Sequence, residues 1–260
     1  MLCTALQASE PQMGVHPWKG ARVAVFGDSV SDLGFRRSGV KHYFTYLEEW
    51  LGLSVYDYAI SGREWNDIPR QCDALFGEHG GDVDAILVLM GTNDFNHGIP
   101  LGEFFEVEYV PVKAAVGRPA EEVVRAHRVP VLSDATYKGR INKGIAHIRE
   151  KYPDIPVVLM TLPHRGYFYA GDNNVQPDEF YPNSIGHWVD EYSDALREAG
   201  RIWSLPVVDL EAEVGYTPML PSQTGFYLWR DGNDSLHPNA LGHERMAKLL
   251  YYRLLSVPMK

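Results

Sequence analysis

Four short polar clusters in the sequence contain the residue types that acyl transfer requires. They are GDS at 27–29, SG at 61–62, GTND at 91–94 and DSLH at 234–237. A serine hydroxyl is a poor nucleophile unless a base lies within hydrogen-bond reach. Ser29 is therefore the candidate nucleophile, and His237 is the candidate base that takes its proton and returns it to the leaving group. Asp234, three residues before His237, is the expected acid that holds the imidazole tautomer.

The same clusters contain candidate donors for an oxyanion hole. The tetrahedral intermediate of acyl transfer needs two or three fixed N–H donors. We expect these donors to be the backbone N–H groups of Ser29 and Gly62 and the side-chain amide of Asn93. Glycine suits position 62, because a donor there must let the backbone approach the substrate closely.

Three further aspartates lie in or near these clusters. We expect Asp28 and Asp94 to be structural and to tie strand ends together through hydrogen bonds. Asp231 competes with Asp234 as the acid, but it falls outside the Asp-x-x-His spacing. We therefore assign the acid to Asp234.

The polar clusters alternate with apolar segments that have the length of strands and helices. Expected strands are 22–26, 54–60, 85–90, 157–160 and 206–210, and helical periodicity is found over 43–51, 65–76, 137–148, 185–199 (ended by Gly200) and 246–254. Nearly continuous apolar strands that alternate with helices indicate a parallel sheet covered on both faces. We predict one α/β domain over 21–260, with its ligand outside the carboxyl ends of the strands.

These motifs resemble those of the SGNH hydrolases, also called the GDSL esterase/lipase family. The matching positions are Gly27-Asp28-Ser29 with Gly34, then Gly62, Gly91-x-Asn93-Asp94, and Asp234-x-x-His237 followed by Pro238. The resemblance extends over residues 22–257. It implies a flavodoxin-like three-layer α/β/α sandwich with a five-stranded parallel sheet. It also implies a serine esterase that works through an acyl-enzyme and uses no metal and no organic cofactor.

Composition and charge exclude several other classes of protein. The 260 residues include 24 Lys and Arg against 34 Asp and Glu, which gives a net charge of −10 and disfavours nucleic acid and anionic membrane surfaces as partners. The longest apolar run, 85–90, is far too short to span a membrane. Two cysteines, Cys3 and Cys72, provide no disulfide framework and no multi-cysteine zinc site.

Two long polar connections, 95–133 and 163–183, begin where the third and fourth strands end. Connections of this length are usually functional. We expect Phe95 and His97 to line the acyl pocket and His164 to face the site. Arg165 is expected either to contact a substrate carboxylate or oxygen or to form a surface ion pair. Trp65 lies on an apolar helical stripe and is expected to pack in the core.

The expected substrate is a small-molecule or carbohydrate ester, with acetyl esters of carbohydrates favoured. The chain is acidic, has 6 Trp and 15 Tyr, and contains no long apolar lid segment. The alternatives that remain open are a lysophospholipase or thioesterase on longer acyl chains, an acyltransferase and a non-catalytic binding module. If the connection 98–133 folds over the site, its apolar residues would build a groove for a long chain. The sequence does not indicate the oligomeric state.

Residues 1–20 are expected to form an N-terminal tail outside the domain. Its first residues are apolar and end in small residues, as in the final part of a signal peptide, although a frayed N-terminus has the same composition. A signal-peptide remnant would favour a periplasmic or secreted location over the cytoplasm.

Overall fold

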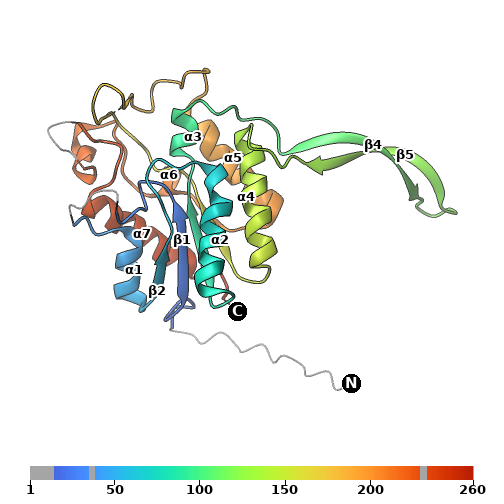
Figure 1. Ribbon diagram of the computed structural model, residues 1–260, viewed down its shortest axis with the longest axis horizontal. Helices are drawn as coiled ribbons and strands as arrows, with labels where there is room; N and C mark the ends of the chain where they lie inside the picture. The colour runs from blue at the N-terminus through green and yellow to red at the C-terminus, as the bar shows by residue number, and fades with distance from the viewer. Residues whose placement is uncertain (1–14, 35–38, 229–232, 260) are drawn as a thin grey trace.

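A five-stranded parallel sheet forms the centre of the protein (Figure 1). The computed structural model describes residues 15–34, 39–228 and 233–259. The strands are β1 (Arg22–Gly27), β2 (Ser54–Asp57), β3 (Ala85–Leu89), β6 (Val157–Met160) and β9 (Val207–Val208), in the order β2-β1-β3-β6-β9. The predicted sheet is thus confirmed. The strand order reverses between β1 and β3, and such a switch point is where open α/β sheets bind ligands.

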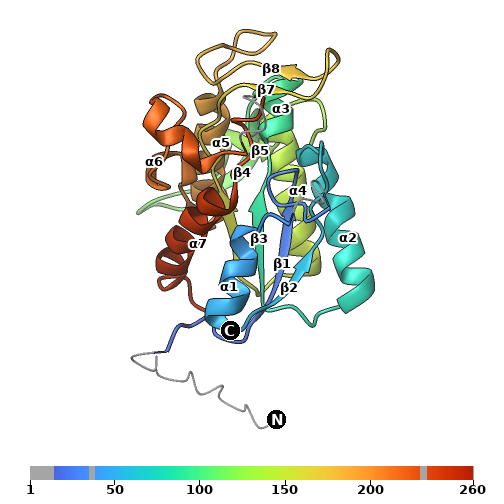
Figure 2. The same cartoon turned by 90° about the vertical axis from the view of Figure 1, so that its left-hand side faces the viewer.

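Helices cover both faces of this sheet and complete the three predicted layers. One face packs against α2 (Ile68–His79), α4 (Tyr137–Lys151) and α5 (Val189–Trp203), and the other against α1 (Tyr43–Leu51) and α7 (Ala240–Leu254). In Figure 2, α1 and α7 lie to one side of β1 and β3, and α2 and α4 lie to the other. Alternate strand residues serve the two faces, so Phe26 and Val25 belong to different core clusters.

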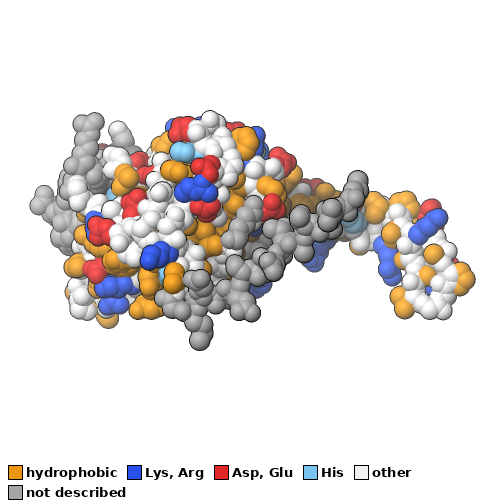
Figure 3. Space-filling model, turned by 90° about the horizontal axis from the view of Figure 1, so that it is seen from below, with side chains coloured by type: hydrophobic (Ala, Val, Ile, Leu, Met, Phe, Trp, Pro, Cys, Tyr) orange, Lys and Arg blue, Asp and Glu red, His pale blue; other side chains and the backbone are white. Residues whose placement is uncertain are grey.

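The connection 95–133 does not fold over the carboxyl ends of the strands. It begins within the short helix α3 (Thr92–Asn96) and continues into an unpredicted hairpin of β4 (Phe105–Ala114) and β5 (Glu121–Pro130). This hairpin projects sideways from the domain as a long arm (Figures 1 and 3). The connection 163–183 forms a second, much smaller hairpin, β7 (Phe168–Tyr169) and β8 (Val175–Gln176), beyond the carboxyl ends (Figure 2).

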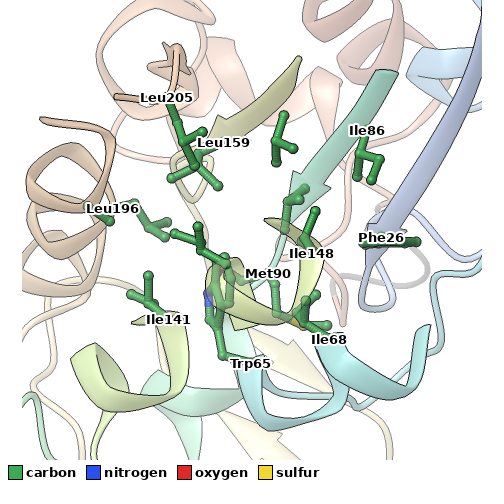
Figure 4. Close-up of a cluster of buried hydrophobic side chains, with 14 of the residues drawn as sticks. Phe26, Trp65, Ile68, Ile86, Met90, Ile141, Ile148, Leu159, Leu196 and Leu205 are labelled. Atoms are coloured by element: carbon green, nitrogen blue, oxygen red, sulfur yellow. Dashed lines mark hydrogen bonds between the residues drawn. The ribbon is translucent and has the colours of Figure 1, made fainter. Parts of the chain in front are cut away.

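Helix α5 differs from its predicted boundaries at both ends. It begins at Val189 rather than Ile185, and it continues through Gly200 to Trp203. The prediction that Gly200 ends the helix is wrong, because this glycine has a packing role. A Cβ atom at position 200 would lie 2.3 Å from Cγ2 of Val207, so only glycine lets α5 approach β9 this closely. Figure 4 shows the core beneath α4 and α5, which includes Trp65 as predicted.

Part of the predicted N-terminal tail packs against the domain. Trp18 is fully buried, and its indole N–H donates to the carbonyl of Val257 at 3.1 Å. The ring of His16 lies 2.9 Å from the carbonyl of Tyr251. Residues 1–14, which would contain the signal-peptide remnant, lie outside the described residues. In the part of the chain that is described, no helix combines the length and apolarity needed to cross a membrane.

Two glycine-to-alanine substitutions test the packing role of Gly200. A Cβ atom at Gly77, inside α2, would meet no other atom within 4 Å, so Gly77→Ala should raise the free energy of unfolding by about 0.5–1 kcal/mol. Gly200→Ala should lower it by about 1–3 kcal/mol, because the added methyl group overlaps Val207. Urea unfolding of both variants measures the difference. Equal stabilisation by both substitutions would contradict the packing role.

Candidate active site

The structure brings Ser29, Asp234 and His237 together at the carboxyl end of β1. Nε2 of His237 lies 2.9 Å from Oγ of Ser29. On the other side of the ring, Nδ1 lies 3.1 Å from each carboxylate oxygen of Asp234. All three residues are buried. This arrangement can move a proton from the hydroxyl to the imidazole while the carboxylate holds the ring. The competing acid, Asp231, lies outside the described residues.

The loop that carries Asp234 and His237 is folded around the carboxylate itself. Oδ1 of Asp234 accepts hydrogen bonds from the backbone N–H groups of His237 at 2.9 Å and Leu236 at 3.2 Å. The three-residue spacing therefore lets one tight turn place the carboxylate beneath the imidazole. Asn239 then caps α7 by accepting from Leu241 and Gly242, which fixes the end of the loop.

A segment after β6 supports this loop from outside, and the sequence analysis missed it. The backbone N–H of Ser235 donates to Tyr167 at 2.8 Å, and that of Gly166 donates to Ser235 at 2.7 Å. Phe168 forms a β-bridge with Asp234, and its ring meets the His237 ring edge-on at 5.2 Å. The tripeptide 167–169, three aromatics after an apolar strand, was the available signal for a pairing segment.

Ser29 is positioned by buried polar contacts just before it in the chain. The side-chain amide of Gln71 pairs with both backbone groups of Gly27, accepting from its N–H at 2.9 Å and donating to its carbonyl at 3.0 Å. Asp28 is buried and accepts from the N–H of Val30 at 3.1 Å, a local contact within the loop that carries Ser29. Burial raises the pKa of Asp28 to about 7.

Two of the three candidate oxyanion donors, Gly62 and Asn93, lie in loops that are bonded to each other. Gly62 has φ +78°, which favours glycine, and the preceding N–H of Ser61 donates to Oδ2 of Asp32 at 2.8 Å. The side-chain amide of Asn93 donates one N–H to the carbonyl of Arg63 at 2.9 Å. Because an amide group has two N–H donors, the second remains for a substrate oxygen.

A buried ion cluster joins these two loops to α4. Asp94 is fully buried and accepts from the backbone N–H of Trp65 at 3.0 Å and from Arg140 at 2.8 Å. Arg140 also donates to Glu64 at 2.7 Å. Burial raises the pKa of Asp94 to about 6, although Arg140 acts in the opposite direction. The predicted structural role of Asp94 is confirmed.

The two candidate pocket residues after Asn93 lie in different environments. Phe95 is buried in the core, where its ring meets Tyr192 edge-on at 5.6 Å. His97 is exposed, and its Nδ1 lies 2.5 Å from a carboxylate oxygen of Glu64. The structure therefore places His97 at the surface, beside the loop that carries Gly62, and places Phe95 in the core below that surface.

Arg165 does not form the surface ion pair that was one of its two predicted roles. Its side chain is 2 % exposed and lies over the ring of Phe95. Its guanidinium donates to Asn96 at 2.6 Å and to Gln176 at 3.1 Å, and burial lowers its pKa to about 10. The neighbouring His164 is half-buried and pairs with Glu179, which raises the pKa of the imidazole. Arg165 thus ties α3 to β8, behind the residues that face solvent.

A small cavity touches the reacting groups. Its volume is about 10 Å³, and its lining includes Ser29, His237, His42 and His243. Burial, together with the neighbouring histidines, holds the pKa of His243 well below its ordinary value. In the described residues, no group of three His, Cys, Asp or Glu side chains is arranged to hold a metal ion.

Comparison with solved structures supports the fold. The chain is similar to a Lactobacillus plantarum protein (22% identity, 92% of this chain and 98% of that one, TM-score 0.68). It is also similar to a protein described as a possible lipase from Chitinophaga pinensis (20% identity, 89% of this chain and 96% of that one, TM-score 0.65). An acetylxylan esterase from Geobacillus stearothermophilus is a further match (17% identity, 92% of this chain and 96% of that one, TM-score 0.52). At these identities the likeness shows the three-layer fold alone.

The sequence itself matches one family model over most of its length. The model describes the GDSL-like lipase/acylhydrolase family and matches residues 25–245, which include all four polar clusters. A search of curated proteins finds no match. The chain therefore belongs to the GDSL-like lipase/acylhydrolase family and is a carboxylic ester hydrolase.

Proposed function

We propose that the protein hydrolyses short-acyl esters, chiefly acetyl esters of carbohydrates, through an acyl-enzyme on Ser29. The observation that carries the mechanism is the continuous contact from Ser29 through His237 to Asp234, at 2.9 Å and 3.1 Å. A base within this distance of a hydroxyl activates it as a nucleophile. The carboxylate stabilises the imidazolium that forms.

The reaction proceeds in two half-reactions. Oγ of Ser29 attacks the ester carbonyl carbon as its proton passes to Nε2 of His237. The tetrahedral intermediate carries negative charge on the former carbonyl oxygen, which the N–H groups of Ser29, Gly62 and Asn93 stabilise. The intermediate collapses, the C–O bond breaks, and His237 protonates the leaving alcohol. Water then attacks the acyl carbon as its proton passes to Nε2 of His237. The second tetrahedral intermediate collapses, the bond between the acyl carbon and Oγ breaks, and His237 returns the proton to Oγ, which releases the carboxylic acid and free Ser29.

Two observations support a short acyl group. The cavity of about 10 Å³ beside Ser29 is far too small to hold a long acyl chain. The apolar residues of β4 and β5, which would suit a long acyl chain, lie on an arm that projects away from the site (Figure 1). A long chain needs a continuous apolar groove, because each buried methylene contributes only about 0.8 kcal/mol.

The loops beyond the carboxyl ends support a hydroxyl-rich leaving group. They expose several aromatic side chains, namely Tyr167, Tyr169, Phe180, Tyr181 and Trp188. A cavity of about 250 Å³ among these loops is lined by Phe180 and Trp188 together with Glu179 and Glu211. Ring faces pack against the C–H faces of sugars, and carboxylates accept hydrogen bonds from hydroxyl groups. The acetylxylan esterase that shares this fold acts, by its description, on an acetylated carbohydrate.

Specificity constants for a series of esters test this proposal. With nitrophenyl esters from two to twelve carbons, we expect kcat/KM to be highest for acetate and to fall steeply with chain length. Acetylated xylo-oligosaccharides should be cleaved faster than phospholipid esters assayed in parallel. A maximum at eight carbons or beyond would contradict the carbohydrate assignment and favour a lysophospholipase or thioesterase.

Removal of the nucleophile tests the mechanism. Ser29→Ala should lower kcat by several orders of magnitude, about 10⁶-fold in well-studied serine hydrolases, because serine and its base act as a unit. A serine-directed phosphonate should label the native enzyme once and leave the variant unlabelled. Ser31→Ala, two residues away and bonded to Tyr43 instead, is the matched control and should still be labelled. Full activity of Ser29→Ala would exclude a serine acyl-enzyme.

Removal of the amide donor tests the oxyanion hole. Asn93→Ala should lower kcat by roughly 10²–10³, about 2.7–4 kcal/mol, with KM little changed. The reason is that this N–H binds charge that develops only in the transition state. Steady-state kinetics on nitrophenyl acetate separate the two parameters. A rise in KM alone would make Asn93 a substrate-binding residue instead.

A further inference from the structure

The projecting hairpin, residues 105–130, is hereafter called the arm. Among the described strands, β4 and β5 pair with each other and with no third strand. An isolated two-stranded hairpin is marginally stable in water, because it cannot bury a core. The arm nevertheless has a firm base. The side-chain amide of Asn142 in α4 donates to the carbonyls of Phe104 at 2.8 Å and Val131 at 3.0 Å. Phe104 directly precedes β4 and Val131 directly follows β5, so Asn142 holds both ends of the arm.

The strand register divides the arm into two faces. Tyr109 lies opposite Ala126, and Pro111 lies opposite Val124. Side chains alternate between the two faces along each strand. One face is hereafter called the stripe face. Its residues are Phe105, Val107, Tyr109, Pro111 and Lys113 of β4 and Glu122, Val124, Ala126, Arg128 and Pro130 of β5. The position of Arg128 over the Phe105 ring agrees with this division.

The stripe face is apolar at its centre and strongly exposed. Tyr109 is 74% exposed, Val124 68% and Val107 59%. The opposite face mixes valines with charged residues, carries the Glu108–His127 ion pair, and keeps Val110 and Val123 half-buried. The more apolar face of the arm is therefore the more exposed one, which is typical of a surface that a partner covers.

The pattern along the stripe face is complementary to itself. Consider a twofold axis that crosses the arm at the level of Val110 and Arg125, between two stripe faces. It stacks two arms in opposite directions, with β4 over β4 and β5 over β5. The register then sets Tyr109 against the partner's Pro111, Ala126 against the partner's Val124, and Arg128 against the partner's Glu122. Apolar side chains meet at the centre of the stripe face, and Arg128 meets an unlike charge, whereas Val107 faces the partner's Lys113.

We propose that the stripe face is the interface of a homodimer in which two arms pack face to face and antiparallel. Such an interface is isologous, so each contact occurs twice. At the tip of the arm Val116 is 97% exposed, and at its base Leu132 is 58% exposed. The antiparallel arrangement brings each tip to the base of the partner's arm, so that these two apolar side chains approach one another.

Sedimentation velocity of the full chain over a concentration series tests the proposal. The native protein should associate to twice the 29.3 kDa of one chain. Tyr109→Lys should leave it monomeric, whereas Val112→Lys, the matched control on the opposite face, should leave the dimer intact. Hydrolysis of nitrophenyl acetate verifies that both variants are folded. A native protein that is monomeric at every concentration, or a dimer that survives Tyr109→Lys, overturns the proposal.

A charge exchange tests the antiparallel register. Arg128→Glu or Glu122→Arg alone should each raise the dimer dissociation constant by roughly tenfold, because two like-charge contacts replace two favourable ones. The double variant restores unlike charges across the interface and should bind more tightly than either single variant, although Arg at position 122 then lies opposite Lys113 of its own arm. A double variant weaker than either single variant would overturn this register.

Discussion

The active site depends on one contact between residues that are far apart in the chain, the 2.9 Å approach of His237 Nε2 to Ser29 Oγ. Neither loop can establish this distance alone. Ser29 follows β1, which lies between β2 and β3 in the sheet, and His237 precedes α7, which packs on the same face as α1. A third segment, after β6, pairs with the Asp234 loop through Gly166 and Ser235. The parallel order of β1, β3 and β6 brings these segments to a common edge.

Buried polar groups fix the geometry at this edge more than they stabilise the fold. Asp94 and Arg140 form a buried pair whose mutual attraction is largely offset by the cost of removing both charges from water. Their effect is to join the Gly62 and Asn93 loops, which carry two of the candidate oxyanion donors, to α4. Gln71 fixes the position of Gly27 through hydrogen bonds to both of its backbone groups. Without Gln71 these groups would be buried without a partner.

The sequence predicts most of the fold and the candidate site, because both are recorded in local patterns. Apolar runs mark the five strands, and the Asp-x-x-His spacing places the carboxylate of Asp234 beneath His237 in one turn. The residues that support the candidate site cannot be recognised from a local sequence pattern. Arg140 reaches Asp94 from a helix 46 residues later, and Phe168 meets the His237 ring from another loop. Such contacts depend on tertiary packing, which spacing along the chain does not encode.

The connection after β3 shows where local patterns stop being informative. Residues 105–109 alternate apolar and acidic side chains, so a strand could have been predicted there from period two. Its direction could not, because direction depends on Asn142, which holds the two ends of the arm from α4, and on Trp203, which donates to Asn142 at 2.8 Å. The same apolar residues would have built an acyl groove over the site or an interface far from it. Asn142 bonds both ends of the arm, and the arm it holds projects away from the rest of the domain (Figure 1).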